Sequence, residues 1–408
     1  MIKKSTNIEY YLIAALIIFS FLSRLVTVYF FRDLQFDNEW GILLNNLINY
    51  KSFSFYNFNG ELIPSAYMPP LYPFFLYIIK IIAPFEESNL LYSIFFIQII
   101  LSSYSVYLFY EINKNFFSNN LSLINSIVFS VIPLNVYACG QISSMNLQII
   151  SSLLFLKFLF LIIKTETNRN IIIFSIVSGL LFLIRGEFIL IFIFIYLFII
   201  WKKKIKLINL IKIAIVVTLV ISPYVVRNYI HFNQFFLVKS LGYNLWKGNN
   251  ELSKVEGFEN FERENFSKLK SKIDNLDKNK YYEIGRDKVF FSVAIKNLKQ
   301  DPFHYMELYF KKLSSFFFID INSSYPNYYN FFHIVPIILI SLLSFPGMFI
   351  FFTRSKFENK CIGLYFFMNL IIFSLFFILP RYKLIVLPIQ VIFAANFVLY
   401  LLKKFEKN

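Results

Sequence analysis

Two short stretches of the chain each place a charged side chain among polar and aromatic neighbours, directly beside an apolar segment. Phe-Asp-Asn-Glu-Trp occupies residues 36–40, just after the first long apolar run, and Ser-Pro-Tyr-Val-Val-Arg-Asn-Tyr occupies residues 222–229. A carboxylate can take a proton from a hydroxyl or an amine, and a guanidinium can bind a phosphate through two hydrogen bonds. On one side of a membrane, such a pair is suited to moving a group away from a lipid phosphate.

The composition indicates an integral membrane protein. Of the 408 residues, 57% are hydrophobic, 21% are aromatic and only 16% are charged, which a soluble globular surface does not allow. The formal net charge of +16 would suggest a nucleic-acid partner for a soluble protein. Because much of this charge lies in short loops between apolar runs, it reports orientation in the membrane instead, and we expect no nucleic-acid partner.

Basic residues in short loops stay on the cytoplasmic side and therefore set the topology. The lysine-rich segment 202–206 is the main anchor, and the charged chain ends agree with it. We expect an all-α protein with about ten transmembrane crossings in the cytoplasmic membrane and with both termini in the cytoplasm. Residues 171–201 are too long for one span and carry Arg185 and Glu187 near the middle. This run predicts a helical hairpin that turns on the outer side.

The first outer loop, residues 32–89, is expected to contain two surface helices. Apolar side chains from Trp40 to Leu47 recur at helical spacing, while asparagines take the other face, which is typical of an interfacial helix. The apolar segment 71–83 extends only about 20 Å as a helix, too short for a hydrocarbon core of about 30 Å. It is expected to lie along the outer surface.

The chain divides into three expected regions. Residues 1–226 form a transmembrane catalytic module that includes the first outer loop. Residues 227–333 form an outer region, which is dense in both signs of charge from Lys247 to Asp301, and residues 334–408 form the C-terminal transmembrane helices. The segment 121–138 is expected to be one of the crossings.

Seven stretches, taken in order, resemble the motifs of one enzyme superfamily. They are Arg24, Asp37-Asn38-Glu39, Tyr67-Met68-Pro69-Pro70-Leu71-Tyr72-Pro73, residues 179–187, residues 223–229, residues 242–250 and Pro380-Arg381-Tyr382-Lys383. The chain is similar to the GT-C superfamily, in particular to bacterial proteins like dolichyl-phosphate-mannose protein mannosyltransferases and the lipid A aminoarabinose transferase. The resemblance implies transfer of a sugar from a polyprenyl-phosphate donor to a lipid, glycan or protein acceptor outside the cytoplasm, usually with inversion.

The resemblance places the catalytic acid in the first outer loop. Asp37 falls where the family carries its acidic motif, so it is the expected base. The alternative is that Asp37 only caps the following helix. Glu39 could share the role by binding the acceptor or a divalent ion, or could be a solvated acid at a helix start. Asn38 stands where many relatives have a second acid.

Four basic residues at the outer face are candidates for the leaving lipid phosphate. Arg381 with Lys383 is favoured because a short turn holds it near the bilayer, and Arg227 and Arg185 emerge on the same side. The alternative is that arginines at span ends only extend to lipid headgroups. Arg24 lies inside an apolar run, so it is expected to face the protein interior and pair with an acid.

A polar and aromatic cluster is the candidate for substrate binding. Tyr243, Asn244, Trp246 and Asn249 could stack on a sugar and form hydrogen bonds with it, and Tyr72 of the first-loop motif is included with them. The alternative is that these residues are interfacial aromatics without a ligand.

Asn146 stands where many relatives carry an acid before the fourth span, which leaves acceptor binding or a metal contact open. We expect no cofactor, and a divalent metal is not excluded. Competing classes are a flippase for lipid-linked saccharides and a surface polysaccharide polymerase or ligase. A flippase predicts internal repeats and a charged path through the membrane, neither of which is evident.

Overall fold

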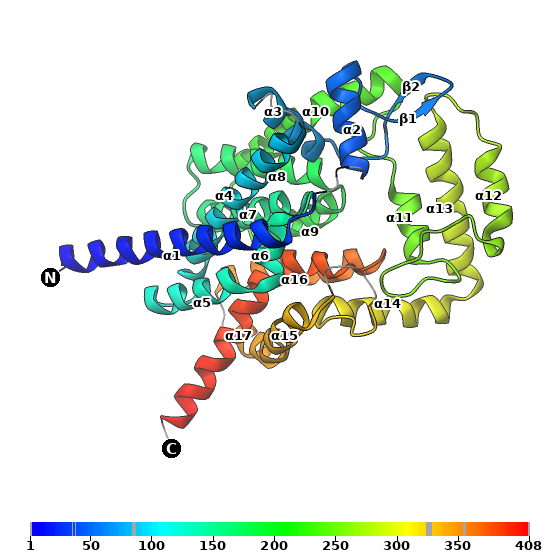
Figure 1. Cartoon of the computed structure of the whole chain (residues 1–408). Coiled ribbons are helices and arrows are strands. Elements are labelled where there is room, and N and C mark those ends of the chain that lie inside the picture. The colour runs from blue at the N-terminus through cyan, green and yellow to red at the C-terminus, as the bar shows by residue number, and fades with distance from the viewer. Residues whose placement is uncertain are drawn as a thin grey trace.

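Long apolar helices and shorter, more polar helices make up most of the computed structural model, which describes residues 2–34, 36, 38–83, 87–323, 329–353 and 356–406 (Figure 1). Asp37, the expected base, lies outside the described residues. The first half contains α1 (Ile2–Phe31), α2 (Glu39–Tyr50), β1 (Ser54–Phe58), β2 (Glu61–Pro64), α3 (Leu71–Ile82), α4 (Glu87–Asn113), α5 (Asn119–Val131), α6 (Pro133–Tyr137), η1 (Ala138–Gly140), α7 (Met145–Lys164), α8 (Asn168–Ile184) and α9 (Glu187–Trp201). The second half contains α10 (Leu207–Phe232), α11 (Leu241–Gly248), η2 (Glu264–Phe266), α12 (Ser267–Asp274), α13 (Tyr282–Gln300), α14 (Pro302–Phe317), α15 (Phe331–Phe352), α16 (Phe357–Ser374), η3 (Pro380–Tyr382) and α17 (Lys383–Phe405).

Within the described residues, six helices are long and apolar enough to cross a membrane, or seven if one bent pair counts as a span. The six lie in α1, α4, α7, α10, α15 and the η3–α17 segment. The expected single crossing at 121–138 is the bent pair, which turns by 61° after α5. Pro133 explains the break, because proline cannot donate the helical hydrogen bond and forces Ile132 into an extended conformation. The structure therefore supports a multi-pass membrane protein, with fewer full-length spans than the ten expected.

The helical hairpin predicted within 171–201 is present. Helix α8 ends at Ile184 and α9 begins at Glu187, so the turn falls on the two residues between them. These helices have 17 and 15 residues and are shorter than the six candidate spans. The short apolar segment 71–83 is also a separate helix, α3.

The predicted helix after the acidic motif is α2, and its apolar stripe is buried as expected. Its N-cap is Asn38, whose side-chain oxygen accepts hydrogen bonds from the backbone N–H groups of Trp40 at 3.0 Å and Gly41 at 3.2 Å. An oxygen at this position satisfies donors that have no partner inside the helix. The capping function considered for Asp37 therefore belongs to Asn38.

A β-hairpin, which an all-α expectation omits, joins α2 to α3. Strands β1 and β2 pair antiparallel, with Phe58 opposite Glu61. The two turn residues, Asn59 and Gly60, have φ angles of 53° and 91°. Asparagine and glycine are the residues that most readily adopt this left-handed conformation, and Asn-Gly is the strongest short sequence signal for such a turn.

Arg24 is buried in the helical body, the name we use for α1–α10 with α15–α17, but its partners are not acidic. Its guanidinium donates to Ser102 Oγ at 2.7 Å, to Ser20 Oγ at 2.5 Å and to the carbonyl oxygen of Ser130 at 3.2 Å. No carboxylate among the described residues forms an ion pair with it. Among the described residues no acid takes the expected place; neutral oxygens of α1 itself, α4 and α5 accept the hydrogen bonds of Arg24 instead.

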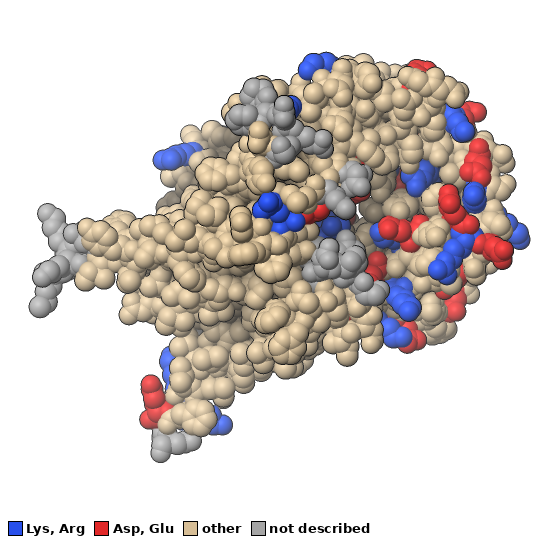
Figure 2. Space-filling model, in the orientation of Figure 1, with Lys and Arg blue, Asp and Glu red and all other residues tan. Residues whose placement is uncertain are grey.

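Helices α11–α14 form a separate layer at one end of the molecule, which we call the cap (residues 241–317). Figure 1 shows both chain termini at the opposite end, with α1 and α17 projecting away from the cap. The cap has its own apolar core, formed by Trp246, Phe266, Leu269, Ile273, Phe290 and Ala294. In Figure 2 the charged side chains crowd over the cap, while the visible face of the helical body is largely uncharged. This division suits a protein that has one part in lipid and one part in water.

We expect that Gly242→Ala weakens the packing of α11 on α13. A Cβ at this position would lie 2.0 Å from the carbonyl oxygen of Asp287 and 2.8 Å from Phe291 Cβ, so the two helices must separate. Overpacking of this kind costs about 1–3 kcal/mol of unfolding free energy. Thermal unfolding in detergent measures the loss. Gly285→Ala is the matched control, because the nearest atom is a flexible Leu276 methyl at 3.3 Å; an equal loss in both variants would contradict the proposed cause.

Candidate active site

A cavity of about 830 Å³ lies between the helical body and the cap. Figure 2 shows a hollow at this level with charged side chains along its rim. Several segments far apart in sequence form its wall: the start of α2, the loop at 67–69, the turn before α7, the α8–α9 turn, the approach to α11, Arg286 of α13 and the segment 376–382. The cavity is therefore assembled by tertiary packing and belongs to no single helix pair.

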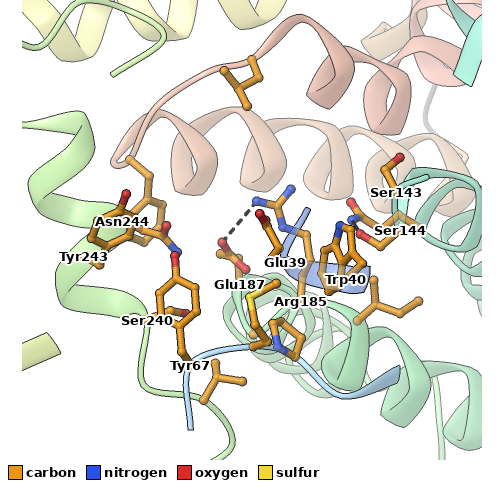
Figure 3. A pocket seen from close by; sticks show the side chains of 18 of the residues that line it. Glu39, Trp40, Tyr67, Ser143, Ser144, Arg185, Glu187, Ser240, Tyr243 and Asn244 are labelled. Carbon is orange, nitrogen blue, oxygen red and sulfur yellow. Dashed lines mark hydrogen bonds and ion pairs between the residues drawn. The ribbon is translucent and has the colours of Figure 1, made fainter. Parts of the chain in front are cut away.

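The α8–α9 turn contributes a cation to the cavity. Arg185 follows the last residue of α8 and forms an ion pair with Glu187 at 3.5 Å (Figure 3). Its guanidinium carbon lies 4.3 Å from the ring centre of Tyr382 and 4.8 Å from that of Phe373. Arg381, from the same 380–382 turn as Tyr382, also lines the cavity. Two guanidinium groups thus lie at the end of the cavity that the helical body forms.

The acidic start of α2 lies beside this cationic end. Glu39, in the first turn of the helix, has an exposed side chain that lines the cavity together with Asn38. In Figure 3 its carboxylate lies near Arg185 and Glu187, with Ser143 and Ser144 of the turn before α7 beyond Trp40. Within the described residues, no three His, Cys, Asp or Glu side chains are grouped so as to hold a metal ion.

The cap side of the cavity is aromatic. The rings of Tyr67 and Tyr243 meet edge to face with centres 5.8 Å apart. Burial raises the pKa of both phenols, so they stay protonated at neutral pH and can donate hydrogen bonds. Arg286 of α13 lies with its guanidinium carbon 5.2 Å from the Tyr243 ring centre and donates to Tyr56 Oη at 2.5 Å.

Tyr56, Tyr67 and Arg286 were not among the site residues predicted from the sequence. Tyr67 lay in a motif that the resemblance had already singled out, so that motif was a usable signal. Tyr56 and Arg286 come from a hairpin and a helix 230 positions apart, and nothing in either local sequence links them.

Half of the predicted site residues that the structure describes line the cavity. They are Glu39, Arg185, Arg381, Tyr243 and Asn244. The structure brings these five together from the first loop, the α8–α9 turn, the segment before α17 and α11. The catalytic and binding roles assigned to them stay predictions.

Two of the predicted basic residues have other tasks. Arg227 donates to the carbonyl oxygens of Ser65 at 2.6 Å and Phe53 at 3.1 Å, so it holds the β-hairpin segment in place. Lys383 is buried and donates to the carbonyl oxygens of Phe316 and Phe317, which end α14. Neither side chain lines the cavity. The N–H groups of both donate to backbone carbonyl oxygens elsewhere.

Three of the predicted substrate contacts are structural. Trp246 lies fully buried in the core of the cap. Asn249 donates to the carbonyl oxygen of Leu375 at 2.9 Å and thereby links α11 to the end of α16. Tyr72 is buried under Trp40, with ring centres 5.1 Å apart, and donates to Gln98 at 3.3 Å. None of these three side chains lines the cavity.

Comparison with known proteins agrees with the resemblance. Residues 68–226 match the model of the dolichyl-phosphate-mannose-protein mannosyltransferase family. No curated protein matches the chain. The matched residues include the loop at 67–69 from Met68 onward, the turn before α7 and the α8–α9 turn, so a large part of the cavity wall falls inside the family match.

Solved structures of an archaeal oligosaccharyltransferase have a similar fold. The enzyme AglB from Archaeoglobus fulgidus, in complex with an inhibitory peptide and a dolichol-phosphate, aligns with a TM-score of 0.55 and 15% identity over 97% of this chain and 51% of its own. The Archaeoglobus fulgidus oligosaccharyltransferase tethered to an acceptor peptide with the NVT sequon aligns with a TM-score of 0.55 and 14% identity over 97% and 50%. The chain thus spans about half the length of that enzyme. This likeness confirms the expected all-α membrane fold, although not the expected number of about ten crossings.

We expect that Arg227→Gln lowers stability, because the carbonyl oxygens of Ser65 and Phe53 lose a charged donor while they remain buried. Each such bond is worth about 1.5–3 kcal/mol. The unfolding midpoint in detergent, followed by tryptophan fluorescence, should fall by several degrees. Arg263→Gln, at an exposed position of the cap, is the matched control. An unchanged midpoint in Arg227→Gln would show that these bonds do not hold the segment.

Proposed function

We propose that this chain is a membrane glycosyltransferase that moves a sugar from a polyprenyl-phosphate donor to an acceptor outside the cytoplasm, with inversion at the anomeric carbon. The family match over residues 68–226 and the GT-C fold support this function. The main observation in favour of this function is the set of side chains that line the cavity. Its body end combines Arg185 and Arg381 with the acidic start of α2, and its cap end is lined by tyrosines.

The chemistry follows from these residue types. The acceptor hydroxyl or amine attacks the anomeric carbon while the bond from that carbon to the phosphate oxygen breaks, and the acceptor proton passes to a carboxylate. Asp37 is the proposed base, and its neighbour Asn38 lines the cavity. Glu39 is proposed to orient the acceptor. The lipid phosphate leaves with both electrons of the broken bond, and Arg185 and Arg381 stabilise its negative charge.

The proposed orientation places the cap outside the cytoplasm, within the outer region 227–333, and both termini inside. Two observations support it. The lysine-rich segment 202–206 follows α9 at the end of the helical hairpin away from the cavity, and both termini lie at the opposite end of the molecule from the cap (Figure 1). The donor's polyprenyl chain would then lie in the membrane while its phosphate reaches the cavity.

We expect that Asp37→Asn abolishes most sugar transfer, by about 10²–10⁴-fold, because the amide cannot take the acceptor proton. Transfer of label from a radiolabelled polyprenyl-phosphate sugar in proteoliposomes measures the rate, and retention of the donor on washed protein measures binding. Donor binding should be unchanged. Asp274→Asn, exposed on α12, is the matched control. Full transfer by Asp37→Asn would remove Asp37 as the base.

We expect that Arg381→Gln and Arg185→Gln each raise the KM for the lipid-phosphate donor by roughly tenfold or more, because each removes charge-assisted hydrogen bonds worth about 1.5–3 kcal/mol. The same proteoliposome assay at varied donor concentration gives this value. Arg263→Gln again serves as the control. If both cavity variants kept the wild-type KM, the phosphate would have to bind elsewhere.

A further inference from the structure

We propose that Glu283 and Asp287 are positioning residues that fix Tyr67 and Tyr243 as one wall of the cavity, and that this tyrosine wall receives the sugar ring. The second part rests on the proposed function, while the first part stands on geometry alone. Both carboxylates belong to α13, and neither was singled out by the sequence. They lie one helical turn apart, on either side of Arg286, which itself lines the cavity.

Glu283 holds the loop that carries Tyr67. Its side chain is only 4% exposed and accepts hydrogen bonds from the backbone N–H groups of Ala66 at 2.5 Å and Tyr67 at 2.7 Å. Ser65 Oγ donates to the same carboxylate at 3.1 Å. A buried carboxylate is costly unless such donors surround it, and here one short loop supplies all three. The direction in which the Tyr67 ring leaves the backbone is therefore set by a helix more than 200 positions away in sequence.

Asp287 performs the same task for α11. Its Oδ1 accepts a hydrogen bond from the backbone N–H of Tyr243 at 3.0 Å, in the first turn of the helix. Gly242, the preceding residue, packs directly on the backbone of Asp287, so the two helices approach closely at this point. A carboxylate at a helix N-terminus also interacts favourably with the unpaired N–H groups there. Tyr243 thus takes its place in the cavity from the same helix that places Tyr67.

The resulting wall has the chemistry of a sugar subsite. Tyrosine rings offer an apolar face for the C–H side of a pyranose, and their hydroxyl groups offer hydrogen bonds at the edge. Figure 3 shows Tyr67 and Tyr243 together on one side of the cavity, with Ser240 and Asn244 beside them and Arg185 across from them. A sugar whose anomeric phosphate lies at Arg185 and Arg381 would extend toward this wall.

The positioning is tested without any substrate by cysteine labelling. Tyr67→Cys and Asn244→Cys each place a thiol in the cavity wall, and the native Cys139 and Cys361 are both buried. We expect Glu283→Gln to speed the reaction of a water-soluble maleimide with Tyr67→Cys by about threefold or more but not its reaction with Asn244→Cys, because only the Tyr67 loop is released. Asp287→Asn should instead speed the reaction with Asn244→Cys but not the reaction with Tyr67→Cys.

This crossed pattern separates positioning from general loosening. Equal acceleration at both sites by either substitution, or no change at either site, overturns the positioning. Glu262→Gln, exposed in the same cap, is the matched control and should change neither rate. Because the labelling requires no turnover, its result does not depend on whether the enzyme transfers a sugar.

The sugar wall is tested by a double-mutant cycle on transfer from radiolabelled polyprenyl-phosphate mannose and glucose. We expect Glu283→Gln to raise the donor KM about tenfold with a smaller change in kcat, and to have little further effect when Tyr67→Ala is already present. Additive effects of the two substitutions would overturn the sugar wall. A different result would contradict the proposed function: wild type and Asp37→Asn bind both donors equally, and wild type transfers neither sugar. The labelling pattern would still decide whether Glu283 and Asp287 position the two tyrosines.

Discussion

The segment from β1 to Tyr67 forms hydrogen bonds with two side chains of opposite charge, and the wall of the cavity depends on the position of this segment. Arg227 of α10 donates to the carbonyl oxygens of Phe53 and Ser65, while Glu283 of α13 accepts from the N–H groups of Ala66 and Tyr67. Burying either charge alone would be costly, and each is compensated by backbone dipoles of the same loop. Because one charge comes from the helical body and the other from the cap, the loop also joins the two parts.

Much of the helical framework could be predicted from the sequence, because it follows from local rules. The apolar stripe of α2 has helical spacing, the length of α3 is too small for a span, and a charged Arg-Gly-Glu triplet inside a long apolar run cannot remain in lipid. Each of these features lies within a segment of about 20 residues, and that segment alone is enough to predict the local structure. The β-hairpin was missed although Asn59-Gly60 signals it, since an all-helical interpretation left no place for strands.

The tasks of individual charged residues could not be predicted in the same way. Arg227 and Arg185 both follow long apolar runs and look alike in sequence. The first donates to backbone carbonyls, and the second lines the cavity beside Glu187. Which of these happens depends on whether a neighbouring segment presents free carbonyl oxygens, and that is set by tertiary packing. The same reason explains why Lys383 ends inside the core and why Arg286, far along the chain, enters the site.

The two arginines at the body end of the cavity come from neighbouring turns, and the surroundings of Arg185 favour directional hydrogen bonding. Arg185 lies 3.5 Å from Glu187, so the net charge of that turn is close to zero when both are ionised. Its stacking on Tyr382 fixes the plane of the guanidinium and thereby aims its N–H groups, which suits directional hydrogen bonding more than long-range attraction. Arg381 comes from the adjoining 380–382 turn and lines the same cavity. A phosphate bound at this end of the cavity would therefore be oriented by the fixed guanidinium of Arg185, while Arg381 would supply donors from the neighbouring turn.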